Sequence, residues 1–237
     1  MKINFNIKNN WQKFLFLSAI LFFNFPLLKA QVAVDHKGTF LFTGASMDIP
    51  GENNKMLFYY GYSPSDNFQA FTFLPFINLH KNIQFMPGYM MTKADGNEIF
   101  TNLQHSFMPS LIFNFKLGKR FVLTDRNMYF HLERKGADHV SFYRNRIGLI
   151  YNAKLFNKPA SFFVHDAMFW SLESGKFTRN RVILGSSVKA TKWLTPQIWY
   201  VLQNDVKGAT QHQFYLYLTV PLENFGVFGS KNKKTAQ

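Results

Sequence analysis

Residues 143–151 read Tyr-Arg-Asn-Arg-Ile-Gly-Leu-Ile-Tyr, and this alternating stretch decides the fold. One face of an extended chain collects large apolar side chains, namely Tyr143, Ile147, Leu149 and Tyr151. The opposite face collects arginine and glycine, namely Arg144, Arg146 and Gly148. Side chains alternate across a β-strand with a period of two residues, so the stretch predicts a strand with one apolar and one polar face.

The same alternation recurs further along the chain. In 179–189, the apolar residues Val182, Leu184 and Val188 oppose Arg179, Arg181, Gly185, Ser187 and Lys189. If the arginines faced lipid, each would cost ~2–4 kcal/mol near mid-membrane. Four would cost on the order of 8–16 kcal/mol, comparable with the whole stability of a domain. We therefore expect a membrane barrel whose apolar faces meet lipid and whose arginines point inward.

Strand-like segments separated by turn residues fill residues 35–221, with no linker that would divide the chain. The expected strands are 38–47, 55–63, 68–79, 82–93, 105–116, 119–134, 139–155, 159–172, 177–190, 194–204 and 209–221. Bacterial single-chain barrels have an even number of strands, so a twelfth strand near 98–104, or only ten strands in the wall, is expected. The fold class is an all-β, antiparallel, up-and-down transmembrane barrel of about 10–12 strands.

The N-terminus has the features of a cleavable signal peptide. Residues 1–13 hold three lysines and no acidic residue, and residues 14–28 are almost wholly apolar. That apolar stretch is shorter than the ~20 residues of a spanning helix, and the small residue Ala30 suits a cleavage site. We predict a signal peptide over 1–30 cut after Ala30, a barrel over 31–222 and a basic tail over 223–237.

Composition narrows the class of protein. The formal charge of +14 falls to 27 − 4 − 13 = +10 once the four lysines of residues 1–30 are removed. The basic residues are scattered along aromatic strands, which disfavours nucleic acid and favours anionic envelope lipids and lipopolysaccharide as partners. An exported barrel would also meet the barrel-assembly machinery. The chain has no cysteine, which excludes disulfides and cysteine metal sites, and no cofactor motif is present.

Residues ~129–220 resemble a known family of outer-membrane barrels. The motifs that carry the resemblance are Tyr143-Arg144-Asn145-Arg146, His165-Asp166-Ala167-Met168-Phe169, Phe177-Thr178-Arg179-Asn180-Arg181 with Gly185, Tyr200 with Gln203, and His212. They are similar to those of the domain of unknown function 2490 family, which usually has glutamate where this chain has Asp166. The resemblance implies an outer-membrane barrel and no known activity.

Register arguments predict an interior charge cluster. A tight turn at Asn157-Lys158 and a two-residue turn at Ser174-Gly175 would bring six residues together: Arg144, Trp170, Arg179, Arg146, Asp166 and Arg181. Trp170 would lie between two guanidinium groups as a cation–π partner. Asp166, Glu133 and Glu173 would be counter-ions. The cluster fits a structural charge network, an anion-selective constriction or a site for an anionic ligand, since arginine binds carboxylate and phosphate through two nitrogens at once.

Three strands carry the same tripeptide pattern, which ends in Pro75, Pro87 and Pro109. Proline cannot donate to a strand ladder and normally lies at edges, ends or bulges. Hairpin geometry predicts that the three prolines form a row across the wall. The row indicates either a line of bulges where the sheet bends or a weakened patch that admits a lipid or ligand sideways.

A search for catalytic and metal-binding residues assigns none. No histidine pair has metal-ligand spacing on an expected helix. A serine hydrolase would need a serine, a histidine and a polar partner, for which His165 with Ser141 or Ser161, or His131 with Ser141, are the candidate pairs. The leading prediction is a structural or narrow-pore barrel with an arginine-rich interior. The alternatives are a barrel-embedded hydrolase or acyltransferase acting on envelope lipids and a soluble periplasmic β-sandwich that binds ligands.

Overall fold

The computed structural model describes residues 34–65, 68–93, 103–134, 138–208 and 210–225. The expected signal peptide (1–30) and most of the expected tail (223–237) lie outside these ranges, and so do all but the last two residues of the possible extra strand near 98–104. Within them the strands are β1 (Val34–Asp48), β2 (Lys55–Ser63), β3 (Phe68–His80), β4 (Ile83–Lys93), β5 (Leu103–Leu117), β6 (Phe121–Arg134), β7 (Val140–Leu155), β8 (Lys158–Ser171), β9 (Phe177–Val188), β10 (Thr195–Asp205) and β11 (Thr210–Pro221). A short 3-10 turn, η2 (Leu222–Phe225), follows. No helix in the described part of the chain is long and apolar enough to cross a membrane.

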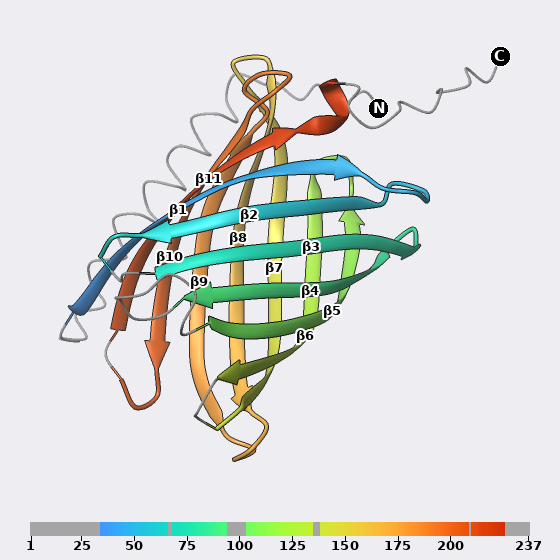
Figure 1. Cartoon of the computed structure of the whole chain (residues 1–237). Coiled ribbons are helices and arrows are strands. Elements are labelled where there is room, and N and C mark those ends of the chain that lie inside the picture. The colour runs from blue at the N-terminus through green and yellow to red at the C-terminus, as the bar shows by residue number, and fades with distance from the viewer. Residues whose placement is uncertain (1–33, 66–67, 94–102, 135–137, 209, 226–237) are drawn as a thin grey trace, which may run out of the picture. The chain divides into compact units, whose positions relative to one another are not determined.

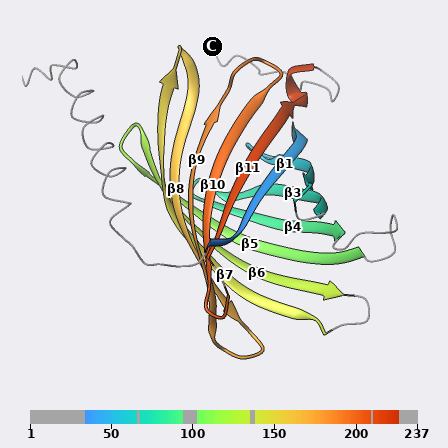
Figure 2. The ribbon, with the colours of Figure 1, turned by 90° about the vertical axis from the view of Figure 1, so that its left-hand side faces the viewer.

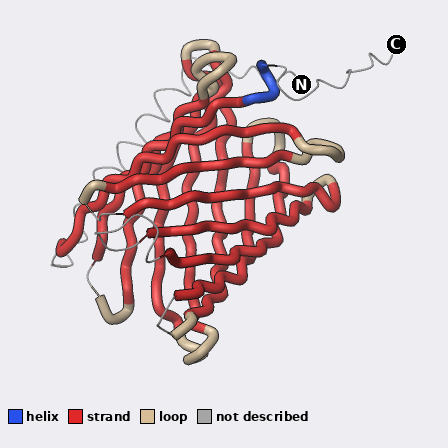
Figure 3. Tube along the Cα trace, viewed as in Figure 1, coloured by secondary structure: helices blue, strands red, loops and turns tan. Residues whose placement is uncertain are grey.

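The strands close into one barrel, which Figures 1 and 3 show from the same side. Strands adjacent in sequence pair antiparallel all the way round, and the barrel closes by pairing β1 with β11. That closing pair is parallel, because eleven strands leave the first and last pointing the same way. The expectation of an even strand count is therefore wrong for the described wall, and β1 begins at the opposite end of the barrel from the end of β11.

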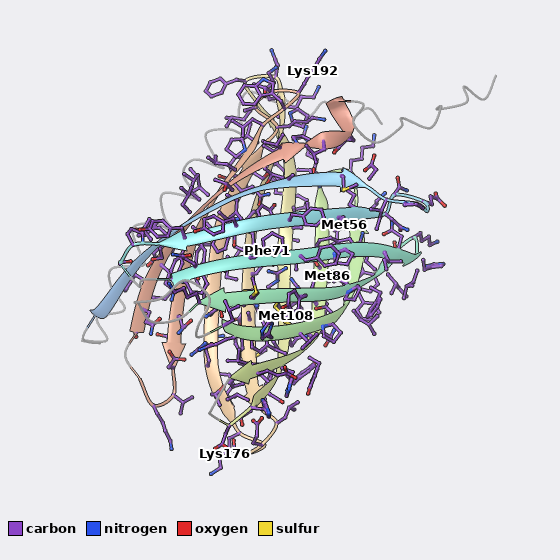
Figure 4. The ribbon with its side chains drawn as sticks, in the orientation of Figure 1. Met56, Phe71, Met86, Met108, Lys176 and Lys192 are labelled. Atoms are coloured by element: carbon purple, nitrogen blue, oxygen red, sulfur yellow. The ribbon has the colours of Figure 1, made fainter. Side chains whose placement is uncertain are left out.

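The two ends of the barrel carry different connections. One end, called here the turn end, holds the connections 49–54, 81–82, 118–120, 156–157 and 189–194. The other, called the loop end, holds 64–67, 94–102, 135–139, 172–176 and 206–209. Figure 4 labels Lys192 at the turn end and Lys176 at the loop end. Three of the turn-end connections have only two or three residues, so neighbouring strands there are tied tightly together.

The outward face of the wall is apolar. Tyr143, Ile147 and Leu149 on β7 are exposed, as predicted from their alternation with the arginines. The same holds round the barrel for Phe71, Phe107, Leu111, Phe162, Val164, Ile198, Phe214 and Leu216. Because the strands form a single closed sheet and not two packed sheets, the alternative of a soluble β-sandwich is wrong.

The inward face is packed with rings, methionines and glycines. Phe40 and Phe42 on β1 stack on Tyr215 and Tyr217 of β11, with ring centroids 4.8 and 4.7 Å apart in the pairs Phe40–Tyr215 and Phe42–Tyr217. A methionine-rich cluster of Met86, Met108, Ile112 and Met128 lies under β4, β5 and β6. Glycines make room for rings on the neighbouring strand: a Cβ at Gly148 would lie 1.9 Å from His165 Nδ1. The inward face over these strands therefore carries large side chains that pack against one another.

Two turns differ from the prediction. As a result, the inward and outward faces of one strand, β8, are exchanged. β7 and β8 are joined by Phe156-Asn157, both with positive φ (48° and 63°), so Arg144 lies opposite Phe169 instead of Trp170. β8 and β9 are joined by the five residues 172–176, with a bulge at Phe169/Trp170. A slip of one residue exchanges the two faces of a strand. The two slips cancel for β9, whose arginines stay inside, and leave β8 alone turned over.

Candidate functional site: an interior arginine cluster

Four arginines from the strands β6, β7 and β9 meet inside the barrel. Arg126 on β6 lies directly opposite Arg146 on β7, and Arg144 follows two residues along the same inward face. Across β8, Ala167 lies between Arg146 and Arg181 of β9. Because Ala167 is small and fully buried, long side chains on both sides extend over it. These strands lie side by side in Figure 2. Arg126, Arg144, Arg146 and Arg181 are called here the arginine cluster.

Neutral partners surround the outer members of the arginine cluster. Arg126 donates from Nε to Ser110 Oγ at 3.2 Å and from a terminal nitrogen to Met86 Sδ at 3.3 Å. Arg181 Nε donates to Gln203 Oε1 at 2.6 Å. Among the described residues no carboxylate forms an ion pair with any of the four guanidinium groups. The cluster is therefore a concentration of positive charge held by neutral acceptors.

Arg144 and Arg146 are less well satisfied. The Nε atoms of both are buried and have no hydrogen-bond partner among the described residues. A buried donor without an acceptor costs about 1–3 kcal/mol, and more where the group is charged. Native structures leave few such donors, and each calls for a specific explanation. The two unpartnered N–H groups mark the point where the cluster lacks an acceptor.

Phe169 is the aromatic partner of the arginines. The guanidinium carbons of Arg144, Arg181 and Arg179 lie 4.8, 5.3 and 5.7 Å from the centre of its ring. Such distances are typical of cation–π contacts. The prediction that Trp170 occupies this place is wrong, because the inverted β8 turns Trp170 outward, where its ring lies 5.8 Å from that of Tyr143.

A neutralised pair lies beside the cluster. Arg179 Nε donates to Asp205 Oδ1, and Asp205 Oδ2 accepts from Gln203 Nε2 at 2.7 Å. Gln203 in turn joins Asp205 to Arg181 and to Gln211. Asp205 is the counter-ion that the sequence-based register missed; its position two residues beyond Gln203 on the inward face of β10 was the available signal.

The expected counter-ions lie elsewhere. Asp166 faces outward, opposite Ile147 and Val182, and accepts a hydrogen bond from Asn180 Nδ2. Its interior placement was wrong for the same reason as that of Trp170. Glu133 also faces outward on β6, where it approaches His131. Glu173 lies in the connection after β8 and accepts the backbone N–H of Ser141.

Asp166 belongs to a polar patch on the outward wall that the sequence reading did not predict. Asp125 accepts from Asn145 Nδ2 at 2.6 Å and from Asn127 Nδ2 at 3.1 Å. Together with Asp166 and Asn180 these residues form the outer amide cluster: Asp125, Asn127, Asn145, Asp166 and Asn180. The cluster extends over β6 to β9 and lies toward the turn end from the outward row of Tyr129, Tyr143 and Trp170.

The three prolines share one level of the outward wall. Pro87 on β4 lies directly opposite Pro109 on β5. The pairing of β3 with β4 keeps one register on both sides of a gap at residues 74–76, which puts Pro75 level with Pro87. The ladder between β5 and β6 is likewise interrupted at Met108 and Pro109. Neither the bulge interpretation nor lateral access is tested by this placement.

Of the histidine–serine pairs considered from the sequence, His131 and Ser141 are in contact. His165 is buried inside the barrel beside Gly148, and Ser161 donates to Asn152. By contrast, His131 and Ser141 lie opposite each other on the outward face, with Nδ1 and Oγ 2.9 Å apart. The described residues contain no group of three or more histidines, cysteines or carboxylates that could hold a metal.

Comparison with known proteins gives a family but no activity. Among solved structures, the NanC porin in a rhombohedral crystal form is similar, with a TM-score of 0.44 and 12% identity over 70% of this chain and 85% of that chain. No curated protein matches the chain. A family model described as "Protein of unknown function (DUF2490)" matches residues 57–214, well over half of the 237 residues. The protein therefore belongs to the DUF2490 family.

Proposed function

We propose that this protein is an integral barrel of the outer membrane, exported by the signal peptide expected over residues 1–30. The exposed apolar side chains of the outward wall support this placement, since a soluble barrel would leave them in water. Two outward aromatic rows lie eight residues apart on β6, at Phe121 and Tyr129. Eight residues of strand rise about 26 Å, or about 20 Å after a typical tilt, close to the ~25 Å apolar band of such barrels.

We further propose that the arginine cluster makes the interior selective for anions. The observation that carries this proposal is the pair of buried Nε donors on Arg144 and Arg146 without partners among the described residues. A carboxylate, phosphate or halide would accept from these donors and relieve the repulsion between neighbouring guanidinium groups. Two such charges ~6 Å apart repel by on the order of 3 kcal/mol at an effective dielectric constant of ~20.

Packing of the interior favours a narrow path. Phe169, Tyr215 and Tyr217 occupy the interior around the arginines, so an anion would pass singly and in contact with side chains. We also propose lipopolysaccharide and the barrel-assembly machinery as partners, because an integral outer-membrane barrel contacts the first and is inserted by the second.

Reversal potentials in planar bilayers test the anion preference. Under a potassium chloride gradient the wild-type protein is expected to favour chloride over potassium, because the path crosses four guanidinium groups that form no ion pair with a carboxylate of the described residues. Replacing Arg144→Gln and Arg146→Gln together should lower the chloride-to-potassium permeability ratio several-fold.

The matched control is Arg120→Gln. Arg120 lies in the turn-end connection 118–120, where it donates to Tyr151 Oη at 3.1 Å, and its loss should leave the ratio nearly unchanged. A folded wild-type barrel that conducts no ions, or a double variant with an unchanged ratio, would refute the pore and leave the cluster as a structural charge network.

A further inference from the structure

A serine, a histidine and a glutamate meet on the outward wall near the loop end, away from the arginine cluster. Ser141 on β7 lies directly opposite His131 on β6, and its Oγ is 2.9 Å from His131 Nδ1. The other ring nitrogen of His131, Nε2, is 3.9 Å from Oε1 of Glu133. A hydroxyl, an imidazole and a carboxylate in this order have the relationship of a nucleophile, its base and the group that orients the base.

The backbone of Ser141 is fixed from the neighbouring connection. Glu173 accepts the N–H of Ser141 through one carboxylate oxygen and the hydroxyl of Ser171 through the other, at 2.9 Å. Leu172 N donates to Ser141 O at 3.0 Å. These bonds hold the serine at the edge of the ladder with its hydroxyl facing His131, which is the preorganisation that a nucleophile requires.

We propose that Ser141 and His131 hydrolyse the ester-linked acyl chains of membrane lipids, with Glu133 as a positioning residue. In the tautomer with its proton on Nε2, His131 Nδ1 takes the proton of Ser141 Oγ as that oxygen bonds to the ester carbonyl carbon. The carbon–oxygen ester bond then breaks, and the proton passes to the leaving alcohol. Water, deprotonated by the same imidazole, releases the fatty acid and restores the serine.

Tyr129 is placed to stabilise the oxyanion of this reaction. Its hydroxyl is 3.4 Å from Ser141 Oγ. Its ring stacks nearly parallel to that of His131, with ring centroids 6.2 Å apart. A phenol beside the nucleophile can donate to the negative oxygen that develops when the carbonyl is attacked.

The position on the wall selects the substrate class. Ser141 and His131 lie two residues closer to the loop end than Tyr143 and Tyr129, which with Trp170 form an outward-facing aromatic row. Such aromatic rows mark the boundary between hydrocarbon and headgroups, where the ester bonds of membrane lipids lie. The inference rests on the membrane placement proposed above and is independent of the anion pore.

The barrel offers a matched control for the histidine. His212 on β11 also faces outward and bonds a tyrosine, with Nδ1 2.5 Å from Tyr200 Oη. Its partner across the strand is Leu202, which has no hydroxyl. Replacing His212 therefore removes an outward imidazole of the same kind without touching Ser141.

The test uses the purified full chain, with its insertion verified by resistance to carbonate extraction and by a heat-dependent gel shift. One arm supplies phosphatidylethanolamine vesicles, the other purified lipopolysaccharide, and free fatty acid is measured in both. A fluorophosphonate probe is added separately, because an activated serine displaces its fluoride and becomes covalently labelled. We expect fatty acid from at least one lipid, which identifies the source of the ester, and labelling at Ser141.

The variants separate catalysis from structure. Ser141→Ala should abolish release and labelling, and His131→Gln should lower release by about 10²–10⁴-fold. Glu133→Gln should lower kcat about tenfold with KM unchanged, and Glu133→Asp should recover part of it, whereas His212→Gln should match wild type. An inserted, folded barrel that releases no fatty acid from either lipid and leaves Ser141 unlabelled would overturn the proposal, as would full activity in Ser141→Ala.

Discussion

At Phe169 a single ring lies within 4.8–5.7 Å of three guanidinium carbons while the rest of its surface is buried. Phe169→Leu removes the ring and leaves the arginines without their cation–π partner. We expect a loss of about 2–3 kcal/mol of unfolding free energy, from cation–π contacts of ~0.5–2 kcal/mol and a partly filled cavity. Urea unfolding in lipid vesicles measures it. The adjacent outward change Met168→Leu is the control, and equal effects of both would contradict the observed register.

The outer amide cluster makes a second prediction for single residues. Asp166 and Asn180 bond each other on a wall whose exposed large side chains are mostly apolar. Replacing both with leucine should raise the unfolding free energy by about 1–2 kcal/mol, since a carboxylate facing hydrocarbon is unfavourable. Val182→Leu, beside Asp166, should change little. A fall in stability would instead show that something polar covers this patch.

Residue identity predicted which arginines lie inside but not which residues meet them. The alternation in 143–151 placed Arg144 and Arg146 correctly, because lipid excludes arginine whatever the register. The contact with Phe169 depends on the turn at Phe156-Asn157, where both residues have positive φ. Such turns favour asparagine and glycine, and phenylalanine at the first position gave no signal in the sequence. The turn was therefore placed one residue late, and Asp166 and Trp170 were assigned to the wrong face.

Single elements were more predictable than their contacts. All eleven strands were expected, and ten begin and end within two residues of the expected bounds; β1 begins four residues earlier, at Val34 instead of 38. The long alternating segments and the turn residues between them carry this information locally. The bulge at Phe169/Trp170 and the five-residue connection 172–176 were missed, since a bulge changes register without changing composition.

The proline row makes a prediction for β3, β4 and β5. Three positions on adjacent strands lack an N–H where the ladder is interrupted, so amide exchange should be faster around Leu74–Phe76 and Met86–Gly88 than in β7 and β8. Pro75→Val with Pro87→Val supplies two donors and should slow exchange there while preserving assembly. Hydrogen exchange with mass spectrometry measures both. Protection already equal to that of β7 would contradict a weakened ladder.

At the scale of the whole barrel, the parallel closure was not predictable from local patterns. The pairing of β1 with β11 joins residues more than 170 positions apart in the sequence. The local sequence of neither strand indicates which strand it pairs with. The even-count rule therefore gave the wrong expectation. The consequence is physical: the start of β1 and the end of β11 lie at opposite ends of the barrel.

Cross-linking tests the closure directly. Thr43 lies opposite Leu218 in the parallel pair, and both face outward. The chain contains no cysteine, so Thr43→Cys with Leu218→Cys should form an intrachain disulfide under mild oxidation. Thr43→Cys with Phe214→Cys places the second thiol four residues away, about 13 Å along the strand, and should not. The reverse outcome would mean that β1 pairs with β11 in another register or direction.

The central claim is that the wall turns its apolar face to lipid and its arginines to the interior. Single cysteines at Arg144, Arg146, Ile147 and Leu149, each carrying a fluorophore, report this when the barrel is placed in vesicles of brominated lipid. The account predicts strong quenching at Ile147 and Leu149 and weak quenching at Arg144 and Arg146. Equal quenching at all four positions, or stronger quenching at the arginines, would contradict it.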